Sequence, residues 1–437
     1  MKAITSAITA KTPFHLRATD KQWTKRLIGG IALSLSFSVL AGGEAQAASF
    51  TFSTIADNRG SFDVFSNPRF TGDTAINDSG IVAFRAFQFL SEDRGPSEPQ
   101  GVFTGKGDSI TTIQVRFDYE TAYCSVDINN KGTVIFGRAI YRDGCSLFIS
   151  SNGVVTPIYT TDSRFESTSL GAINDRGVVA FTKSYDDYPY VDEILTSNGR
   201  TITTIAVSNF EDNDSPFESL GDPDINNSGT VAFRANLVEG DSGIFTISDG
   251  DISAISDTSN RFDSFGNPTI NDSGTLAFRA ELDEGGSGIF TSNDSDITPI
   301  ADTSGQFSFF GFPTPYGNFL TDPAINNRGE VAFLAGLDTG GYGIFTSSNL
   351  ADKVIAIGDS LFSSTVTELF FSNKGLNNHG QLAFYARLAD GTEGIFRANP
   401  DTSEPEPVPE PASALSLLAF GALGVGSLGK SRKKQSS

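Results

Sequence analysis

The chain has 437 residues, of which 38% are hydrophobic, 19% are charged and 45 are glycine. Because tight turns need residues that tolerate positive φ, this balance favours a β-protein with many turns. The formal net charge is −21, and such an acidic surface repels polyanions, which argues against binding of nucleic acid or anionic lipid.

The N-terminal segment, residues 1–47, has the layout of a secretory signal peptide. A basic stretch ending at Arg26 precedes an apolar run over 27–41, and small residues follow at Ala45 and Ala47. This order predicts export and cleavage after Ala47 by signal peptidase. A retained membrane anchor is the alternative, but the apolar run is shorter than the ~20 residues of a spanning helix.

One pattern recurs seven times within residues 48–400: an Asn, a Gly three positions later and a Phe seven positions later. The Asn and Gly residues are Asn77 and Gly80, Asn129 and Gly132, Asn174 and Gly177, Asn226 and Gly229, Asn271 and Gly274, Asn326 and Gly329, and Asn377 and Gly380. Successive copies are 45 to 55 residues apart, which is the length of a propeller blade and too long for leucine-rich or ankyrin repeats.

The copy over residues 268–301 predicts a four-stranded antiparallel meander, with strands at 269–270, 275–282, 288–291 and 297–300. In a type I turn, an Asn side chain accepts a hydrogen bond from a nearby backbone N–H and a Gly completes the turn. We therefore interpret the repeated Asn and Gly as turn formers rather than ligands. The repeated Phe is expected in the core between blades, at Phe84, Phe136, Phe181, Phe233, Phe278, Phe333 and Phe384.

The seventh copy lacks a fourth strand, and the segment after the expected cleavage site supplies one. Residues 50–57 resemble the fourth strand at 297–302, and pairing them beside Gly394-Ile395-Phe396 would close the ring and remove exposed sheet edges. The sequence thus predicts an all-β, seven-bladed β-propeller of four-stranded blades whose N-terminal strand completes the last blade. A β-solenoid is the alternative, although it does not need its first strand to complete its last repeat.

Few residues are candidates for cross-linking, metal binding or catalysis. Cys124 and Cys145 lie in the second copy and form a candidate disulfide in an oxidising compartment, with two free thiols as the alternative. His379, in a turn, is the one histidine of the expected mature chain, so neither a His-rich metal site nor a Ser-His-Asp triad is expected.

Acidic residues in the turns between second and third strands form a candidate binding rim, on the face shared with the connections between blades. They include Asp143, Asp187, Asp241, Asp283, Asp338 and Asp390. Such a ring could hold Ca²⁺ or meet a basic partner. The simpler interpretation is that Asp and Gly make good hairpin turns on a solvated face.

Residues 401–407 form a Pro- and Glu-rich spacer. Residues 408–437 then combine Val408-Pro409-Glu410-Pro411, an apolar stretch over 412–428 and a basic tail. This order resembles the PEP-CTERM sorting signal. The resemblance implies recognition by an exosortase and transient insertion of the apolar helix into the inner membrane, with the basic tail inside. An anchor that is never cleaved is the alternative.

The repeat Asn-x-x-Gly-x-x-Ala-Phe, as in residues 226–233, resembles that of the NxxGxxAF tandem-repeat proteins, which are exported bacterial proteins with a choice of surface anchors. The resemblance implies export and repeat architecture but no activity. Copy two departs with Ile135 in place of Ala, and copy three has Glu193-Ile194-Leu195 in place of Gly-Ile-Phe.

We therefore expect an exported, non-catalytic binding or scaffold protein of the cell surface or extracellular matrix. Its ligand would be an extracellular glycan, such as exopolysaccharide or biofilm material, or a protein, and it would need no cofactor besides rim-bound Ca²⁺. The alternative is a secreted polysaccharide hydrolase or lyase that uses a carboxylate pair on the propeller face.

Overall fold

The computed structural model describes residues 49–60, 62–65, 74–88, 100–107, 109–116, 121–140, 144–161, 166–169, 171–185, 190–208, 215–258, 261–293 and 296–401. The expected signal peptide, the sorting signal and most of the spacer lie outside these residues. Apart from one short 3₁₀ turn, η1 (Leu350–Asp352), the regular structure of the described residues is β-strand. In this part of the chain no helix is long and apolar enough to cross a membrane.

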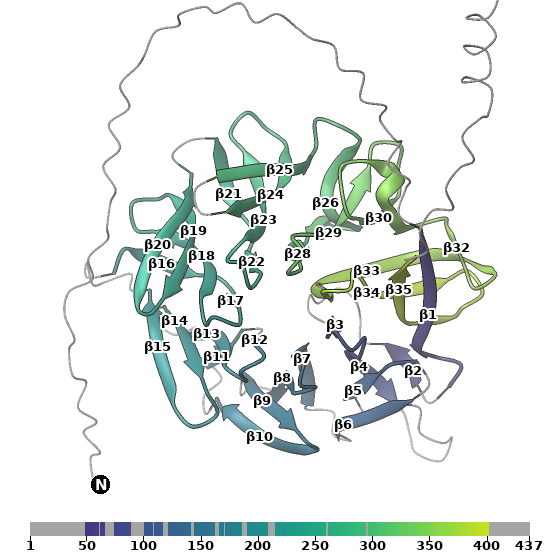
Figure 1. Cartoon of the computed structure of the whole chain (residues 1–437), viewed down its shortest axis with the longest axis horizontal. Coiled ribbons are helices and arrows are strands. Elements are labelled where there is room, and N and C mark those ends of the chain that lie inside the picture. Colours follow the sequence, from purple (N-terminus) through teal and green to yellow (C-terminus); the bar gives the residue numbers. More distant parts are fainter. Residues whose placement is uncertain are drawn as a thin grey trace, which may run out of the picture. The chain divides into compact units, whose positions relative to one another are not determined.

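Seven antiparallel sheets follow one another around a ring (Figure 1). Blade 1 consists of β2 (Phe62–Phe65), β3 (Thr74–Ile76), β4 (Val82–Gln88), β5 (Gln100–Gly105) and β6 (Ile110–Arg116). Blade 2 consists of β7 (Thr121–Ile128), β8 (Val134–Ile140), β9 (Cys145–Ser151) and β10 (Val154–Tyr159). Blade 3 consists of β11 (Glu166–Thr168), β12 (Ala172–Ile173), β13 (Val179–Tyr185), β14 (Val191–Ser197) and β15 (Ile202–Val207).

The other four blades repeat this arrangement. Blade 4 consists of β16 (Phe217–Leu220), β17 (Asp224–Ile225), β18 (Val231–Leu237), β19 (Ser242–Ser248) and β20 (Asp251–Asp257). Blade 5 consists of β21 (Phe262–Phe265), β22 (Thr269–Ile270), β23 (Leu276–Leu282), β24 (Ser287–Asn293) and β25 (Asp296–Asp302). Blade 6 consists of β26 (Phe307–Thr314), β27 (Gly317–Leu320), β28 (Ala324–Ile325), β29 (Val331–Leu337), β30 (Tyr342–Phe345) and β31 (Lys353–Ala356). Blade 7 consists of β32 (Ser360–Leu361), β33 (Ser364–Leu376), β34 (Leu382–Leu388), β35 (Glu393–Pro400) and β1 (Phe50–Asp57).

The ring closes through β1, as the sequence predicts. β1 pairs antiparallel with β35, from Phe50 opposite Pro400 to Asp57 opposite Gly394. Phe52 of β1 also packs edge-to-face on Phe384 of β34, with 6.1 Å between ring centroids. The seven-bladed propeller is thus confirmed, and the solenoid interpretation is wrong.

The innermost strand is longer than the sequence suggests. In blade 5 the expected strand at 269–270 is present as β22, but β21 precedes it and pairs with the same neighbour, β23. Gly266-Asn267-Pro268 separates the two pieces, because proline supplies no N–H to the ladder. The inner strand is unbroken in blades 2 and 7, as β7 and β33.

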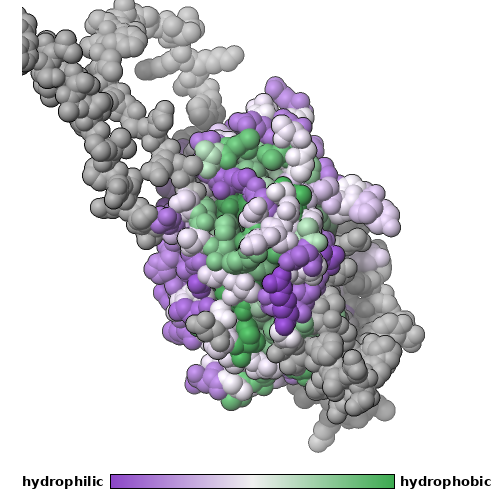
Figure 2. All heavy atoms as spheres, turned by 90° about the vertical axis from the view of Figure 1, so that its right-hand side faces the viewer, coloured by the Kyte–Doolittle hydropathy of each residue, from purple (hydrophilic) through white to green (hydrophobic). Residues whose placement is uncertain are grey.

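The core lies between neighbouring blades. All seven repeated Phe side chains are buried, as predicted. In blade 4, Phe233 stacks on Phe245 of the third strand at 5.7 Å, and in blade 3 the buried Leu195 lies opposite Phe181 instead. Seen from the side of the ring that blade 7 forms, apolar surface lies between hydrophilic patches (Figure 2).

Candidate functional site

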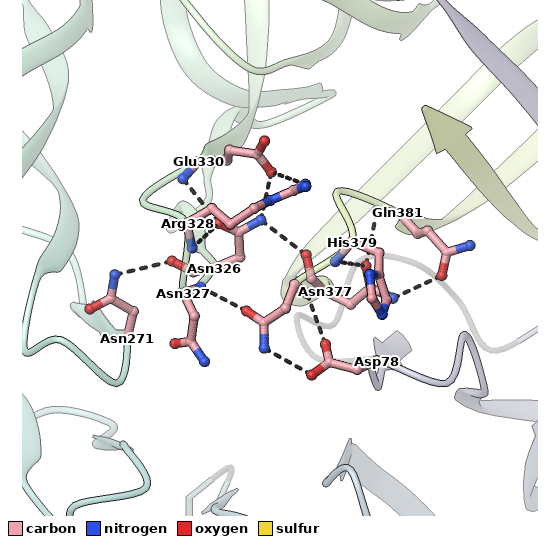
Figure 3. A network of polar contacts seen from close by, with 10 residues as sticks. Asp78, Asn271, Asn326, Asn327, Arg328, Glu330, Asn377, His379 and Gln381 are labelled. Atoms are coloured by element: carbon pink, nitrogen blue, oxygen red, sulfur yellow. Dashed lines mark hydrogen bonds and ion pairs between the residues drawn. The ribbon is translucent and has the colours of Figure 1, made fainter. Parts of the chain in front are cut away.

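The repeated Asn side chains form a closed ring around one mouth of the central channel. Each is buried and its Oδ1 accepts a backbone N–H of its own turn, as Asn226 does from Thr230 at 3.0 Å. Each Nδ2 donates to the backbone carbonyl of the Asn in the next copy, at 2.9–3.1 Å, and Asn377 donates back to Asn77. Figure 3 shows the steps from Asn271 to Asn326 and Asn377.

The turns themselves are as predicted. Each repeated Gly donates its N–H to the carbonyl of its Asn and has positive φ, from 73° at Gly80 to 96° at Gly229. Only glycine adopts this conformation without steric cost. His379 is exposed in the last turn, where its backbone N–H donates to Asn377 Oδ1. The turn interpretation therefore holds, but it explains only the hydrogen bonds to Oδ1 of each Asn and not those from Nδ2.

A second ring uses the residue after each Asn. Its members are Asp78, Asn130, Asp175, Asn227, Asp272, Asn327 and Asn378. Each backbone N–H donates to the side-chain Oδ1 of the next member, at 2.7–2.9 Å. The Asp carboxylates are held by amides from both sides, as Asp175 Oδ2 is by Asn130 at 3.1 Å and Asn227 at 2.9 Å. The two rings line a polar recess of about 160 Å³ that opens to solvent.

Deeper in the channel a lysine joins blades on opposite sides. Lys374 of β33 contacts Asp224 of β17 at 2.5 Å, and both Asp224 and the nearby Asp127 of β7 are buried. Burial raises the pKa of Asp127 to about 6, although Lys374 acts against this shift. Burial works to lower the pKa of Lys374, but Asp224 and Asp127 raise it above its usual value. The lysine is therefore held charged across the channel.

Two more channel carboxylates titrate unusually. Burial raises the pKa of Asp322 to about 6 and also raises that of Asp222, with Arg234 opposing both shifts. Both side chains border a cavity of about 80 Å³ together with residues from blades 2 to 7. Pockets that take drug-sized ligands have about 300–1,000 Å³. This cavity therefore has room for a few waters and not for a sugar chain.

Blade 3 holds a separate buried charge cluster. Lys183 lies 3.3 Å from Glu166 and 3.4 Å from Glu193, and its ammonium lies 4.3 Å from the ring centroid of Tyr185. Since the side chain of Lys183 is only 11% exposed, this cluster binds strands of the blade together rather than facing a ligand.

The described rim acids lie singly on turns. The Asp283 and Asp338 backbone N–H groups donate to Arg261 and Gln306 in the connections between blades, so the turns and connections share a face as predicted. Asp241 accepts the hydroxyl of Thr258, and Asp390 pairs with Arg59 at 2.7 Å. A backbone N–H from Thr392 is the main reason that the pKa of Asp390 is lowered.

Asp143 and Asp187 lie outside the described residues. Within the described ranges, no three His, Cys, Asp or Glu side chains gather closely enough to hold a metal ion. The rim in this part of the chain therefore offers no preformed Ca²⁺ site.

Cys124 of β7 and Cys145 of β9 flank β8 and are bonded to each other. Gly137 of β8 lies beneath them, because a Cβ there would come within 2.8 Å of the Cys145 sulfur. Other copies have a larger residue after the repeated Phe, so Gly137 is the feature of the sequence that could have indicated this pairing.

The sequence patterns do not predict the channel charges, although these leave a trace in the repeat. Two positions before the repeated Asn, copies two and four have Asp127 and Asp224, whereas the other copies have Ala, Thr or Gly. Lys374 is likewise the one basic residue at its position among the seven copies.

The fold and the interblade hydrogen bonds define a closed seven-bladed β-propeller whose blades are tied by side-chain amides. The chain belongs to the Family of unknown function (DUF7453), whose profile matches residues 42–306, 246–356 and 364–415. The PEP-CTERM protein-sorting motif matches residues 407–433, so this is an exported, surface-sorted propeller that the exosortase system processes. No curated protein matches the chain.

Solved propellers of diverse function share the architecture. A puromycin-hydrolysing peptidase of Mycobacterium tuberculosis is 12% identical, with 79% of this chain and 55% of that chain covered and a TM-score of 0.50. The β-propeller domain of the Trilobed protease from Pyrococcus furiosus is 12% identical over 66% of this chain and 94% of that chain, with a TM-score of 0.39. A chain of the Mitotic Checkpoint Complex is 11% identical over 86% and 99%, with a TM-score of 0.43. Such similarity shows the fold alone.

Proposed function

We propose that this protein is a non-catalytic binding or scaffold protein of the cell surface or extracellular matrix. The channel, narrowed by bonds between the blades, is the observation that supports this function. The repeated Asn side chains are engaged with neighbouring blades, and the Lys374–Asp224 pair crosses what space remains. The interior acts as a fixed support, which leaves the outer faces to meet a glycan or protein.

The processing route is part of the proposal. Signal peptidase cleaves after Ala47, and an exosortase recognises Pro409-Glu410-Pro411 while the apolar segment is briefly inserted in the inner membrane. The mature protein then comprises the propeller and spacer. The Asn-x-x-Gly-x-x-Ala-Phe repeats further suggest kinship with the NxxGxxAF tandem-repeat proteins.

A glycan array tests the proposal on purified residues 48–400, with Ca²⁺ and with EDTA. We expect retention of one glycan class, and release of neither reducing ends nor unsaturated sugars from that glycan. Loss of binding in EDTA would place Ca²⁺ at the rim. Turnover of the bound glycan would contradict the proposal.

A polysaccharide hydrolase or lyase is the second candidate, and one observation favours it. Asp127 and Asp224 come from different blades and lie near each other, and the pKa of Asp127, about 6, suits a general acid. Against it stands the cavity of about 80 Å³. If the array reveals turnover, Asp127→Asn should abolish it while leaving glycan retention unchanged.

A further inference from the structure

Blade 6 carries a hairpin inserted in its innermost strand. β26 runs on to Thr314, turns, and returns as β27, after which the Thr321 N–H donates to the Phe310 carbonyl at 3.4 Å. The two ends of the segment 311–320 therefore meet. The interval from Asn271 to Asn326 is ten residues longer than that from Asn226 to Asn271, so the hairpin is an addition to a complete blade.

The hairpin is held rigidly on blade 7. Phe312 is buried, stacks on Phe319 at 5.1 Å, and meets Phe370 of β33 edge-to-face at 4.4 Å. At the tip, Thr314 Oγ1 donates to the Gly317 carbonyl at 2.6 Å and accepts the Tyr316 N–H at 3.2 Å. The tip is thus preorganised.

This rigid element presents apolar side chains to solvent. Tyr316 is 95% exposed, Phe319 37% and Leu320 39%, and all four residues of β27 are exposed. Segment 311–320 contains no charged residue, in a chain whose net charge is −21. Exposed aromatic groups on a fixed support mark an interaction site rather than a packing need.

We propose that the exposed surface of the hairpin, with Tyr316 in its turn and Phe319 and Leu320 on β27, binds sugar units of a neutral polysaccharide; this rests on the proposed function and deepens it. A pyranose ring has an apolar C–H face that packs against an aromatic ring, and hydroxyls that bond to a phenol or amide such as Asn318. An uncharged tip has no group that pairs with an ionic ligand, and the acidic protein repels polyanionic glycans.

A repeating small unit also fits the size of the tip. A stable protein partner needs about 800 Å² on each side, which is more than three exposed side chains on a ten-residue hairpin provide. A polymer of sugars gains affinity instead by presenting the same unit many times to one rigid contact.

Blade 5 supplies the design of the test. Deleting residues 312–321 joins Phe310-Gly311 to Asp322-Pro323, which reproduces the Phe265-Gly266-Asn267-Pro268 connection of blade 5. The other variants are Tyr316→Ala and Tyr316→Phe. Native affinity electrophoresis of residues 48–400 in gels containing dextran, galactomannan or hydroxyethylcellulose measures affinity, and alginate serves as the anionic comparison. Circular dichroism verifies that each variant is folded.

We expect at least one neutral polymer, and not alginate, to retard the parent protein. Tyr316→Ala and the deletion should weaken this binding about tenfold or more, since aromatic contacts contribute up to about 1.5 kcal/mol beyond burial. Tyr316→Phe should retain binding within about threefold, because the ring face remains.

Equal retardation of the parent and the deletion variant would overturn the inference and leave the proposed function intact, since binding would then lie elsewhere. Retardation by none of the neutral polymers would also overturn it. A parent that sediments as a dimer and a deletion variant that sediments as a monomer, without any effect of sugar, would show that the tip meets a second copy instead.

Discussion

Two regions of the propeller are built in different ways. At the Asn turns, the same positions make the same interblade bonds in all seven copies, from Asn77 to Asn129 and around to Asn377. Away from these turns the copies differ, with Lys374 in one blade, a disulfide in another and the hairpin of residues 311–320 in a third. The uniform region assembles the ring, because each Asn Nδ2 donates to the backbone of a neighbouring copy. The variable features distinguish the copies and are where a ligand would be recognised.

Removing β1 is the change that we expect to destabilise the ring most. A chain beginning at Asn58 leaves β35 with an unpaired edge and takes Phe52 from Phe384. Exposed edges pair with other chains, so we expect aggregation and loss of a cooperative thermal transition. Size-exclusion chromatography and near-ultraviolet circular dichroism measure both. A monomer that melts like the parent would contradict the account of closure.

Asn226→Ala tests one step of the ring. It removes one of the two hydrogen bonds to the Asn271 carbonyl, which keeps the bond from Gly274. It also leaves the Ser228 and Thr230 N–H groups without Asn226 Oδ1. Each unsatisfied group costs about 1–3 kcal/mol when water does not reach it, so we expect the free energy of unfolding to fall by roughly 2–3 kcal/mol in total. Urea unfolding measures this fall.

The matched control is Asn318→Ala, which removes an exposed amide on β27 and should change stability by less than about 0.5 kcal/mol. Equal effects of the two substitutions would mean that the hydrogen bonds of the Asn ring do not contribute to the free energy of unfolding.

The comparison of the two regions also explains what the sequence could predict. Burial of the repeated Phe follows from a local pattern, because strand periodicity lies within one copy. Closure by residues 50–57 follows from comparing the copies, because the fourth strand that the seventh copy lacks is present at the start of the domain. The second bond of each Asn could not be predicted in this way, since its acceptor lies 45 to 55 residues away in the next copy, or 300 residues away for Asn377. Lys374 and Asp224 are 150 residues apart, and only the closed ring brings them together.

The hairpin of residues 311–320 could be predicted only in part. The long interval before Asn326 signals an insertion, but no local pattern shows that Phe310 and Thr321 meet or that Tyr316 points to solvent. Those features depend on Phe370, which blade 7 supplies.

Asp322→Asn examines the channel charge. The pKa of Asp322 is raised from 3.8 to about 6, so the folded state binds the proton more tightly than the unfolded chain. The stability that this proton provides is present below pH 4 and is lost as the pH rises through 6. The variant should therefore match the parent near pH 4 and exceed it at pH 7, by at most about 3 kcal/mol.

Urea midpoints at pH 4, 5, 6 and 7 measure this difference. Asp283→Asn, on an exposed hairpin turn, is the control and should leave the pH profile unchanged. A parent and an Asp322 variant whose stabilities run parallel from pH 4 to 7 would show that Asp322 titrates normally.

Gly171→Ala tests how blade 3 makes room for an irregular residue of blade 2. Copy two has Ile135 where the other copies have Ala, and its Cδ1 lies 3.1 Å from where a Cβ on Gly171 would stand. We expect Gly171→Ala to cost about 1 kcal/mol by crowding, and Ile135→Ala to cost more because it leaves a cavity.

In the double variant the new methyl group enters the space that Ile135 vacates, so the combined cost should fall below the sum of the single costs by at least about 0.5 kcal/mol. Urea unfolding of the four proteins measures this coupling. Additive costs would mean that a side chain at position 171 does not crowd Ile135, so that glycine is needed there only for its backbone. A favourable coupling would show that even the irregular copies are fitted to their neighbours in pairs, as the Asn ring fits the regular ones.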